Sequence, residues 1–359
     1  MNQSASEAKP ARSFRLSLIL PILLAAVLLY FAFRGVRWSD FLNTIRHGRP
    51  QYLVLGFLGV TCTYFLRGVR WRILLTAEGE VALLTSFFAV VVGYLGNYVL
   101  PARAGEVIRS VLVSRKTTLS VSYVLATAIT ERIMDSVTLV LISVVALTTL
   151  SGLPAWLLTA AKVMAVIACV GLVFIFVAPR FESQLGALLH RLPAPASVGE
   201  RLDGLLGQFL RGMRALHSPQ RAFAFIGLSL PIWIGDGLVT VSVALALNLS
   251  LSLPQGLLLL AALGLSSAAP STPGYVGVFQ FVAVTVLAPF GFTHSQALAY
   301  IITYQALIYI VVLFWGPIGL WRLQGWSRST LDLSLDTPIP SATESDMPAE
   351  TAATRSTSS

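Results

Sequence analysis

The amino-acid sequence predicts an all-α integral membrane protein with about six full spans and two broken, re-entrant helix pairs. Of its 359 residues, 55% are hydrophobic and only 11% are charged, whereas soluble domains carry about 25% charged residues. Several apolar runs exceed about 18 residues, which is the length needed to cross about 30 Å of hydrocarbon. Two further apolar runs are interrupted by proline and glycine. These three observations exclude a soluble globular domain.

The apolar runs divide the chain in order. Residues 1–13 are expected to form a cytoplasmic tail, 14–323 the membrane domain, and 324–359, rich in Ser, Thr and Pro, a disordered tail. The first run is expected to be a retained span because no small-residue cleavage site follows it. The expected full spans are residues 14–34, 51–68, 119–150, 154–178, 221–247 and 295–321.

Two broken pairs separate these spans. The first pair comprises residues 81–100 and 107–113, and the second comprises 257–269 and 278–290. Irregular backbone at membrane depth is tolerated only where it is buried in protein or lines a wet cavity. Both breaks are therefore expected to lie inside the bundle. The residues expected to make the breaks are Pro101, Gly105, Pro270, Pro273, Gly274 and Gly277.

The two halves of the chain, about 14–150 and 154–323, resemble each other. Aligning them places Pro101 opposite Pro270, and Arg67 opposite Asp236. Each half reads span, span, broken pair, span, so an odd number of crossings would invert one half relative to the other. Inverted repeats are a recurring transporter plan in which discontinuous helices bind substrate near the midplane. The sequence thus predicts two breaks whose tips face each other.

The net charge of +9 belongs to the loops and indicates membrane topology rather than nucleic-acid binding. Lys and Arg concentrate in the segments that lie inside if both termini are cytoplasmic, which predicts a cytoplasmic-membrane protein with N- and C-termini inside. Arginines beside Trp71, at 67–72, are interpreted as an interfacial cluster. Four arginines on the first outside connection remain an exception: Arg34, Arg37, Arg46 and Arg49.

The pattern of residues 198–216 predicts an amphipathic helix, because apolar side chains recur at i, i+3 and i+4. The helix would lie on the membrane, border the inner leaflet, or pack on the bundle as a plain connection. Cys62 and Cys169 fall inside spans and predict no disulfide, and the four histidines lack metal-ligand spacing. No hydrolase, nucleotide-binding or transferase signature is present, so neither a cofactor, a metal nor an enzyme activity is expected.

Ionisable side chains inside the apolar runs are the candidate functional groups, because a charge in hydrocarbon is costly. One alternative is purely structural pairing of Arg103 with Glu106, three residues apart. A second is a closed network of Glu131, Arg132 and Asp135. Lys162 and Asp236 are weaker candidates.

Helix ends at the two tips would present free N–H groups, which favour an anion such as a phosphate. Arg103 and Arg109 would supply its counter-charge. The serines and threonines of the second break would bind substrate or satisfy backbone freed by proline.

Three motifs carry a family resemblance: NYVLPARAGEVIR at 97–109, ERIMD at 131–135 and PSTPGYVGVFQ at 270–280. In this order they resemble the lysylphosphatidylglycerol synthase transmembrane-region family of flippase-like membrane proteins, over residues 14–323. The resemblance implies a membrane domain that moves an aminoacylated phospholipid between leaflets in two-domain members. No synthetase domain is expected after residue 324, so lipid aminoacylation is not implied. Gln280 stands where some members have an acidic residue, so no carboxylate role carries over to it.

The sequence therefore predicts a lipid transporter that translocates or binds a phospholipid, glycolipid or polyisoprenoid-type lipid. Membrane lipids are its expected partners. The alternatives are an accessory subunit of a lipid-biosynthetic enzyme and an intramembrane lipid transferase, and the oligomeric state stays open. The predicted substrate-binding residues are Asn97, Arg103, Glu106, Arg109, Glu131, Arg132, Asp135, Ser271, Thr272, Tyr275 and Gln280.

Overall fold

A computed structural model of the chain describes residues 23–100, 104–150, 154–184, 196–267 and 272–324, and all regular structure in these ranges is helical. The predicted all-α class is confirmed. Of the first expected span, residues 23–33 are described and are helical. Four residues of the predicted breaks and site, Pro101, Arg103, Pro270 and Ser271, lie outside the described residues, as do both tails.

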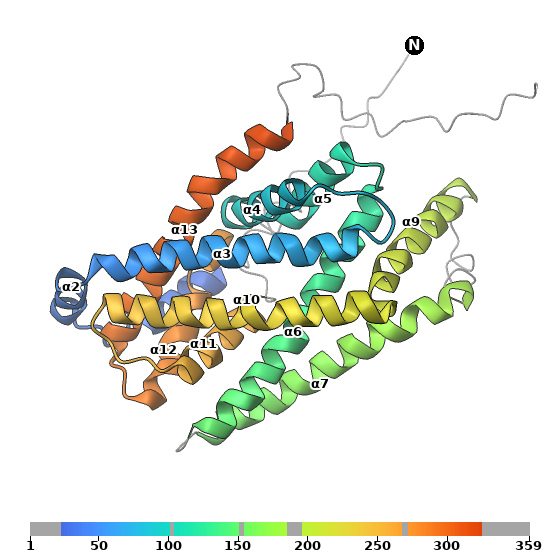
Figure 1. The fold of residues 1–359 in the computed structure, drawn as a ribbon. Coiled ribbons are helices and arrows are strands. Elements are labelled where there is room, and N and C mark those ends of the chain that lie inside the picture. Colours follow the sequence, from blue (N-terminus) through green and yellow to red (C-terminus); the bar gives the residue numbers. More distant parts are fainter. Residues whose placement is uncertain (1–22, 101–103, 151–153, 185–195, 268–271, 325–359) are drawn as a thin grey trace, which may run out of the picture. The chain divides into compact units, whose positions relative to one another are not determined.

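The helices follow the predicted order (Figure 1). Among the described residues, six helical runs are long and apolar enough to cross a membrane. Five of them match expected spans, and the sixth, Pro273–Phe290, is the second arm of the second broken pair. The α-helices are α2 (Trp38–Arg46), α3 (Pro50–Leu75), α4 (Leu83–Val99), α5 (Ala104–Lys116), α6 (Val121–Thr149), α7 (Ala155–Val177), α9 (Ala196–Arg214), α10 (Pro219–Ala246), α11 (Leu253–Ser266), α12 (Val278–Leu287) and α13 (His294–Gln324), with 3₁₀ turns η2 (Ala178–Phe181), η3 (Ala215–His217), η4 (Pro273–Tyr275) and η5 (Ala288–Phe290).

Helix α3 is longer than predicted, and its arginines are not interfacial. The helix continues past residue 68 to Leu75, so the cluster at 67–72 lies within it. Arg67 is 5% exposed, and Arg70 and Trp71 are fully buried. The interfacial interpretation was therefore wrong for these residues. Buried charges require partners, and other helices supply carboxylates for both arginines.

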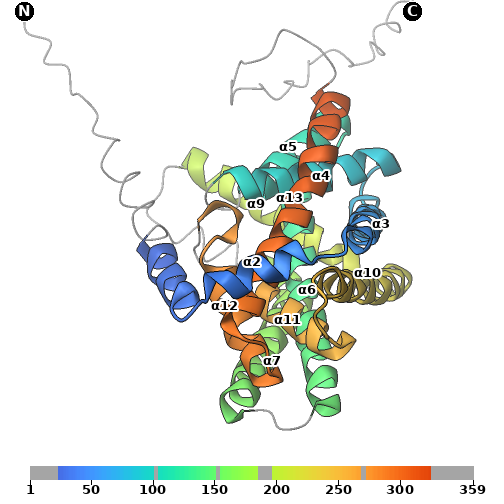
Figure 2. The same ribbon diagram turned by 90° about the vertical axis from the view of Figure 1, so that its left-hand side faces the viewer.

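Helices α3 and α10 lie side by side and antiparallel along their full lengths (Figures 1 and 2). At one end the backbone N–H of Arg49 donates to the carbonyl of Ala246 at 2.6 Å. At the other end Arg221 donates to the carbonyl of Thr76 at 3.4 Å. These are the two spans that the repeat sets opposite each other. The inverted repeat itself stays a prediction.

The first broken pair is the hairpin of α4 and α5, which pack closely through glycines. A Cβ placed on Gly105 would overlap the carbonyl oxygen of Gly93, and one on Gly96 would lie 2.7 Å from the Cα of Gly105. The side chain of Asn97 accepts a hydrogen bond from the backbone N–H of Gly105 at 3.0 Å. Gly105 therefore permits close helix contact as well as marking the break.

The second broken pair consists of α11, η4 and α12. Its backbone turns at Gly274 (φ 70°) and Gly277 (φ 88°), in the left-handed region that glycine adopts without steric cost. Tyr275 between them also has a positive φ of 60°. The predicted glycine breaks at 274 and 277 thus have a conformational reason.

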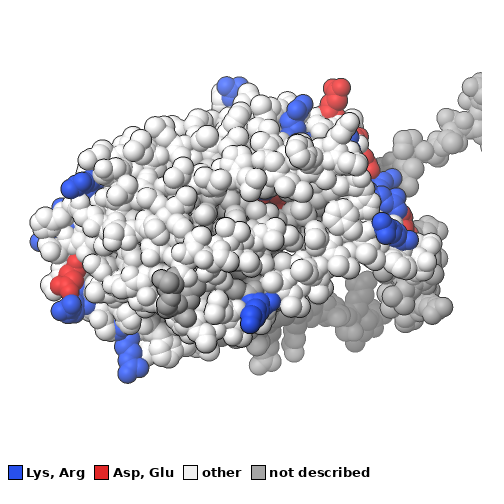
Figure 3. Space-filling model, turned by 60° about the horizontal axis from the view of Figure 1, so that its bottom comes forward, with Lys and Arg blue, Asp and Glu red and all other residues white. Residues whose placement is uncertain are grey.

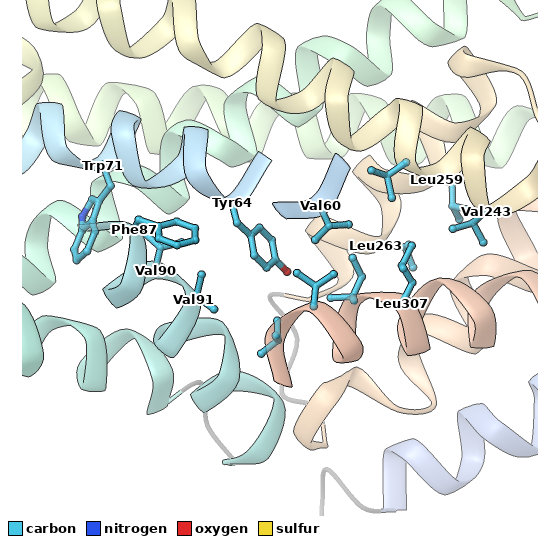
Figure 4. Packing of buried hydrophobic residues seen from close by; sticks show 14 of the residues in the cluster. Val60, Tyr64, Trp71, Phe87, Val90, Val91, Val243, Leu259, Leu263 and Leu307 are labelled. Carbon is cyan, nitrogen blue, oxygen red and sulfur yellow. The ribbon is translucent and has the colours of Figure 1, made fainter. Parts of the chain in front are cut away.

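The main hydrophobic core joins α3 and α4 to α11 and α13 (Figure 4). Val60, Trp71, Val91 and Leu259 are each at most 1% exposed. Charged side chains lie mainly around the rim of the face shown in Figure 3. The broad middle of that face carries few charged side chains, as expected for a surface in contact with lipid.

The connection between the first two expected spans contains the amphipathic helix α2. Its apolar residues Trp38, Leu42 and Ile45 are 56%, 48% and 40% exposed. The helix is tied to α13 where the backbone N–H of Arg37 donates to the hydroxyl of Ser295 at 3.0 Å. This connection is therefore a helix that is fixed to α13 by a hydrogen bond.

The predicted amphipathic helix at 198–216 corresponds to α9 and η3, and it packs on α6. Leu210, Met213 and Leu216 are 1%, 0% and 2% exposed. The hydroxyl of Ser120 donates to the Gln208 side chain at 2.7 Å. Of the alternatives that the sequence left open, packing on the bundle is the one observed.

Candidate functional site

A cavity of about 140 Å³, lined by both apolar and polar side chains, lies between α3, α4, α10, α11, α12 and α13. A single buried water needs only about 10–15 Å³ by this measure, so the cavity has room for a small polar group. Polar and aromatic side chains are unusually dense here for the interior of an apolar bundle. They are Tyr64, Arg67, Tyr94, Tyr98, Trp233, Asp236, Tyr304 and Gln305.

Arg67 forms the charged edge of this cavity. Its Nη2 donates to Oδ2 of Asp236 on α10 at 2.5 Å, and its Nη1 lies 3.6 Å from Oδ2 of Asp135 on α6. The guanidinium also lies over the ring of Trp233, 4.7 Å from its centroid. Arg67 of α3 is thus held by two other helices, α6 and α10.

One helical turn further along α3, Arg70 continues the network. It donates to Oε1 of Glu131 at 3.0 Å and lies 2.7 Å from Oδ1 of Asp135. It also donates to the hydroxyl of Ser229 at 3.0 Å. The second oxygen of Glu131 pairs with Arg109 on α5 at 3.0 Å.

The result is an alternating chain of buried charges, here called the ion network: Asp236, Arg67, Asp135, Arg70, Glu131 and Arg109. Local sequence makes it possible, since residues four apart share a helix face. Glu131 and Asp135 therefore both point from α6 toward α3. Three positive charges balance three negative ones.

A separate pair lies beside the network. Nε of Arg132 donates to Oε1 of Glu106 at 2.8 Å, and these side chains are 33% and 16% exposed. The Arg132 guanidinium lies 5.6 Å from the ring centroid of Tyr94. Arg132 thereby connects α6 to the hairpin of α4 and α5.

The second break is held by neutral groups. The Gln280 side chain accepts from the backbone N–H of Gly277 at 2.7 Å and donates to Gln305 on α13. Gln305 in turn donates to the carbonyl of Gly274 at 3.1 Å, and the hydroxyl of Tyr309 donates to the same carbonyl at 2.8 Å. These four residues, 274, 280, 305 and 309, are called the amide clamp below.

The described ends of the two hairpins meet next to the cavity. The rings of Tyr98 and Tyr275 are 6.3 Å apart, and Tyr98 lies 4.8 Å from Tyr309. Tyr275 stacks on Phe279 at 4.8 Å. Tyr98 and Phe279 also line the cavity, so both breaks adjoin the same space.

The predicted site residues divide into groups. Arg109, Glu131 and Asp135 belong to the ion network. Glu131, Arg132 and Asp135 do not form a closed network, because each takes its partner from another helix. The described partner of Glu106 is Arg132, while Arg103 lies outside the described residues.

Three of the remaining predicted residues form hydrogen bonds with the backbone. Asn97 and Gln280 bond the N–H groups of Gly105 and Gly277. Thr272, which is half-buried, donates to the carbonyl of Val276 at 2.8 Å. The structure thus gives each of them a local structural partner.

Sequence reasoning missed Arg67 and Arg70 as buried groups and ranked Asp236 as weak. One signal pointed to them, since the repeat alignment sets Arg67 opposite Asp236. Spacing is a second signal: Arg67 follows Tyr64, and Asp236 follows Trp233, by three residues each. That spacing places both polar pairs on one face of their helices.

Comparison with known proteins gives two relatives. The chain is 24% identical over 374 aligned positions to "Glycosyltransferase AglD" of Haloferax volcanii, covering 94% of this chain and 58% of that protein. It is 26% identical over 226 positions to "UPF0104 membrane protein MJ1078" of Methanocaldococcus jannaschii, covering 62% of this chain and 91% of that protein. The chain thus spans under two thirds of the length of the first relative.

A family model covers most of the chain. The model described as "Lysylphosphatidylglycerol synthase TM region" matches residues 18–316. That range contains both broken pairs, the ion network, the amide clamp and all the cavity residues. The chain therefore belongs to the lysylphosphatidylglycerol synthase transmembrane-region family of integral membrane proteins.

Proposed function

We propose that this protein binds an amphiphilic lipid and moves it between leaflets, with the headgroup passing through the polar cavity. The observation that supports this most strongly is a cavity among apolar helices whose lining includes unsatisfied hydrogen-bond donors. Nε of Arg67 and Nε1 of Trp233 find no hydrogen-bond partner among the described residues. Leaving a buried donor unpaired costs about 1–3 kcal/mol, so a guest with acceptor oxygens would be stabilised there.

Tyrosine hydroxyls add to this lining. In Figure 4 the ring of Tyr64 projects from α3 with its hydroxyl directed away from the helix, toward the side where Leu263 lies. The rings of Tyr64 and Tyr94 stack at 4.7 Å. Tyrosine combines an apolar body with a polar tip, which suits a site where a headgroup must enter and leave.

In this proposal the ion network positions the cavity. Glu131 and Asp135 hold the arginines of α3, and Arg109 pairs with Glu131. Glu106 and Arg132 tie α6 to the first hairpin. The protein lies in the cytoplasmic membrane with both termini inside, supported by the Lys and Arg distribution. Arg67 and Arg70 no longer count toward that distribution, because both are buried in ion pairs.

The test is leaflet exchange by the purified protein reconstituted in lipid vesicles. Headgroup-labelled lipids are incorporated, and a membrane-impermeant quencher reports the fraction that moves. Wild-type protein should accelerate exchange, and Trp233→Phe should slow it several-fold at unchanged thermal stability. The exposed pair of Arg37 and Asp40 offers the control, since Asp40→Asn should leave exchange unchanged. If exchange is no faster than in protein-free vesicles, the protein does not transport lipid and the proposal is wrong.

A second candidate is an accessory subunit that acts with a separate lipid-biosynthetic enzyme and is not itself catalytic. The relative from Haloferax volcanii favours it, because that protein is named a glycosyltransferase and extends well beyond the matched part. Copurification with one such enzyme, without leaflet exchange, would support this candidate. Covalent lipid turnover by the purified chain alone would instead establish a transferase.

A further inference from the structure

We infer that the cavity receives an uncharged, hydroxyl-rich headgroup of the sugar class, rather than a phosphate or an ammonium group. The inference rests on the proposed function, in that the guest is the headgroup of the lipid being moved. Three independent properties of the lining lead to it: its charge balance, the occupancy of its aromatic faces, and the kind of polar group it offers.

Charge balance disfavours an anion. Arg67 is the cationic side chain that lines the cavity, and carboxylates of Asp236 and Asp135 already lie on it at 2.5 and 3.6 Å. Arg109, expected from sequence to meet a phosphate, is paired with Glu131 at 3.0 Å. A phosphate entering the cavity would have to separate a buried ion pair, and an unpaired buried charge is strongly unfavourable.

The aromatic faces disfavour a cation. Rings of Trp and Tyr attract ammonium and guanidinium groups placed over them, and an aromatic cavity would ordinarily suit a cationic headgroup. Here the protein supplies its own cations to two of the lining rings, those of Trp233 and Tyr94. Arg67 lies 4.7 Å from the ring centroid of Trp233, and Arg132 lies 5.6 Å from that of Tyr94.

Apart from Nε of Arg67, whose charge is already balanced by Asp236 and Asp135, the groups left over are uncharged. Nε1 of Trp233 lacks a partner among the described residues. Tyr64 and Tyr304 line the same space. A tyrosine hydroxyl both donates and accepts, so it is matched by another hydroxyl, whereas a phosphate only accepts and an ammonium only donates.

The volume sets the size of the guest. At about 140 Å³, the cavity is small beside the roughly 300–1,000 Å³ of drug-sized sites. It is therefore suited to one ring bearing hydroxyls rather than to an oligosaccharide.

The test compares three labelled lipids with the same diacylglycerol anchor: monoglucosyl-diacylglycerol, phosphatidylglycerol and lysyl-phosphatidylglycerol. Each is measured for leaflet exchange in vesicles holding the full-length protein, and for retention by native mass spectrometry. The glucosyl lipid should exchange at least tenfold faster than the other two and be preferentially retained. Tyr304→Phe and Trp233→Phe should each lower its retention by about three- to tenfold.

Tyr300→Phe is the matched control. Tyr300 is fully buried one turn before Tyr304 on α13, and its hydroxyl already donates to the carbonyl of Thr240 at 3.2 Å. Removing that hydroxyl deletes a buried hydrogen bond without changing the cavity lining. Retention of the glucosyl lipid should therefore stay at the wild-type level.

The outcomes separate this inference from the proposed function. Faster exchange of either charged lipid, with the same dependence on Tyr304, would overturn the sugar class and leave lipid transport standing. Retention of the glucosyl lipid without exchange would support the sugar class and remove transport. Neither retention nor exchange of any of the three would overturn both.

Discussion

The two helix breaks of this protein are fastened by opposite chemistries. The first, between α4 and α5, is tied through Glu106 and Arg109 to charged partners on α6. The second, between α11 and α12, is held by Gln280 and its partners in the amide clamp, all of them uncharged. Both breaks border one cavity, so the difference concerns how firmly each side of that cavity is fixed.

This difference predicts that substitutions at the two breaks lower the stability of the protein by unequal amounts. Removing one partner of a buried ion pair costs about 3–5 kcal/mol, whereas orphaning a neutral buried group costs about 1–3 kcal/mol. We therefore expect the α4–α5 side to be the fixed wall of the cavity, and the α11–α12 side to rearrange more readily. The following predictions test that contrast, from the largest expected effect to the smallest.

Arg70→Met should give the largest loss of stability. Arg70 is fully buried between Glu131 and Asp135, and its removal leaves two carboxylates short of a cation. We expect a loss of about 3–5 kcal/mol in unfolding free energy, measured by thermal or denaturant unfolding in detergent. Arg37→Met is the control, since that pair is exposed and should change stability by at most about 1 kcal/mol. Equal effects of the two variants would contradict a stabilising network.

Gly105→Ala should be the most damaging glycine substitution in the first hairpin. The added methyl group meets the backbone carbonyl of Gly93, which cannot move without separating α4 from α5. Overpacking of this kind costs about 1–3 kcal/mol or more. Gly204→Ala on α9 is the matched control, because nothing lies within 4 Å of its added Cβ, and alanine there should be neutral or slightly stabilising. A wild-type melting temperature for Gly105→Ala would refute the close packing.

Gln280→Leu should loosen the second break with a smaller loss. It leaves the N–H of Gly277 and the side chain of Gln305 without their partner, at a cost of about 1–3 kcal/mol. Hydrogen exchange should rise around η4 and α12 while α4 and α5 stay protected. If protection falls equally in both hairpins, the two breaks are not independently fastened.

Thr272→Val should have the smallest effect. Thr272 is half-buried and its hydroxyl donates to the carbonyl of Val276, and losing one such neutral hydrogen bond costs about 0.5–1.5 kcal/mol. Leaflet exchange should also stay near the wild-type rate. A clear loss of exchange at unchanged stability would show that Thr272 contacts the substrate, as the sequence alone suggested.

The sequence was sufficient for the fold class and for most helices, because apolar length is a direct requirement of the membrane. It also identified Glu131 and Asp135, since a charge in an apolar run is conspicuous. It misplaced Arg67 and Arg70, because an arginine beside a tryptophan is typical of an interface. Their burial depends on the antiparallel pairing of α3 with α10, which a linear sequence does not display.

The cavity was harder still to predict. Tyr64, Tyr98 and Tyr304 are individually ordinary residues of apolar helices, and they converge only through tertiary packing. Gln280 was read as a substrate-binding residue because of its place in a family motif. Its partner Gln305 lies on another helix, so no local pattern could have shown that the two form a clamp.

The balance of the ion network has an electrical consequence. A membrane potential does about 2.3 kcal/mol of work per 100 mV on each elementary charge carried across it. The network contains three arginines and three carboxylates, so displacing it as a unit moves no net charge through the field. With an uncharged headgroup in the cavity, the exchange rate should be the same in polarised and unpolarised vesicles. This protein would then work without sensing voltage.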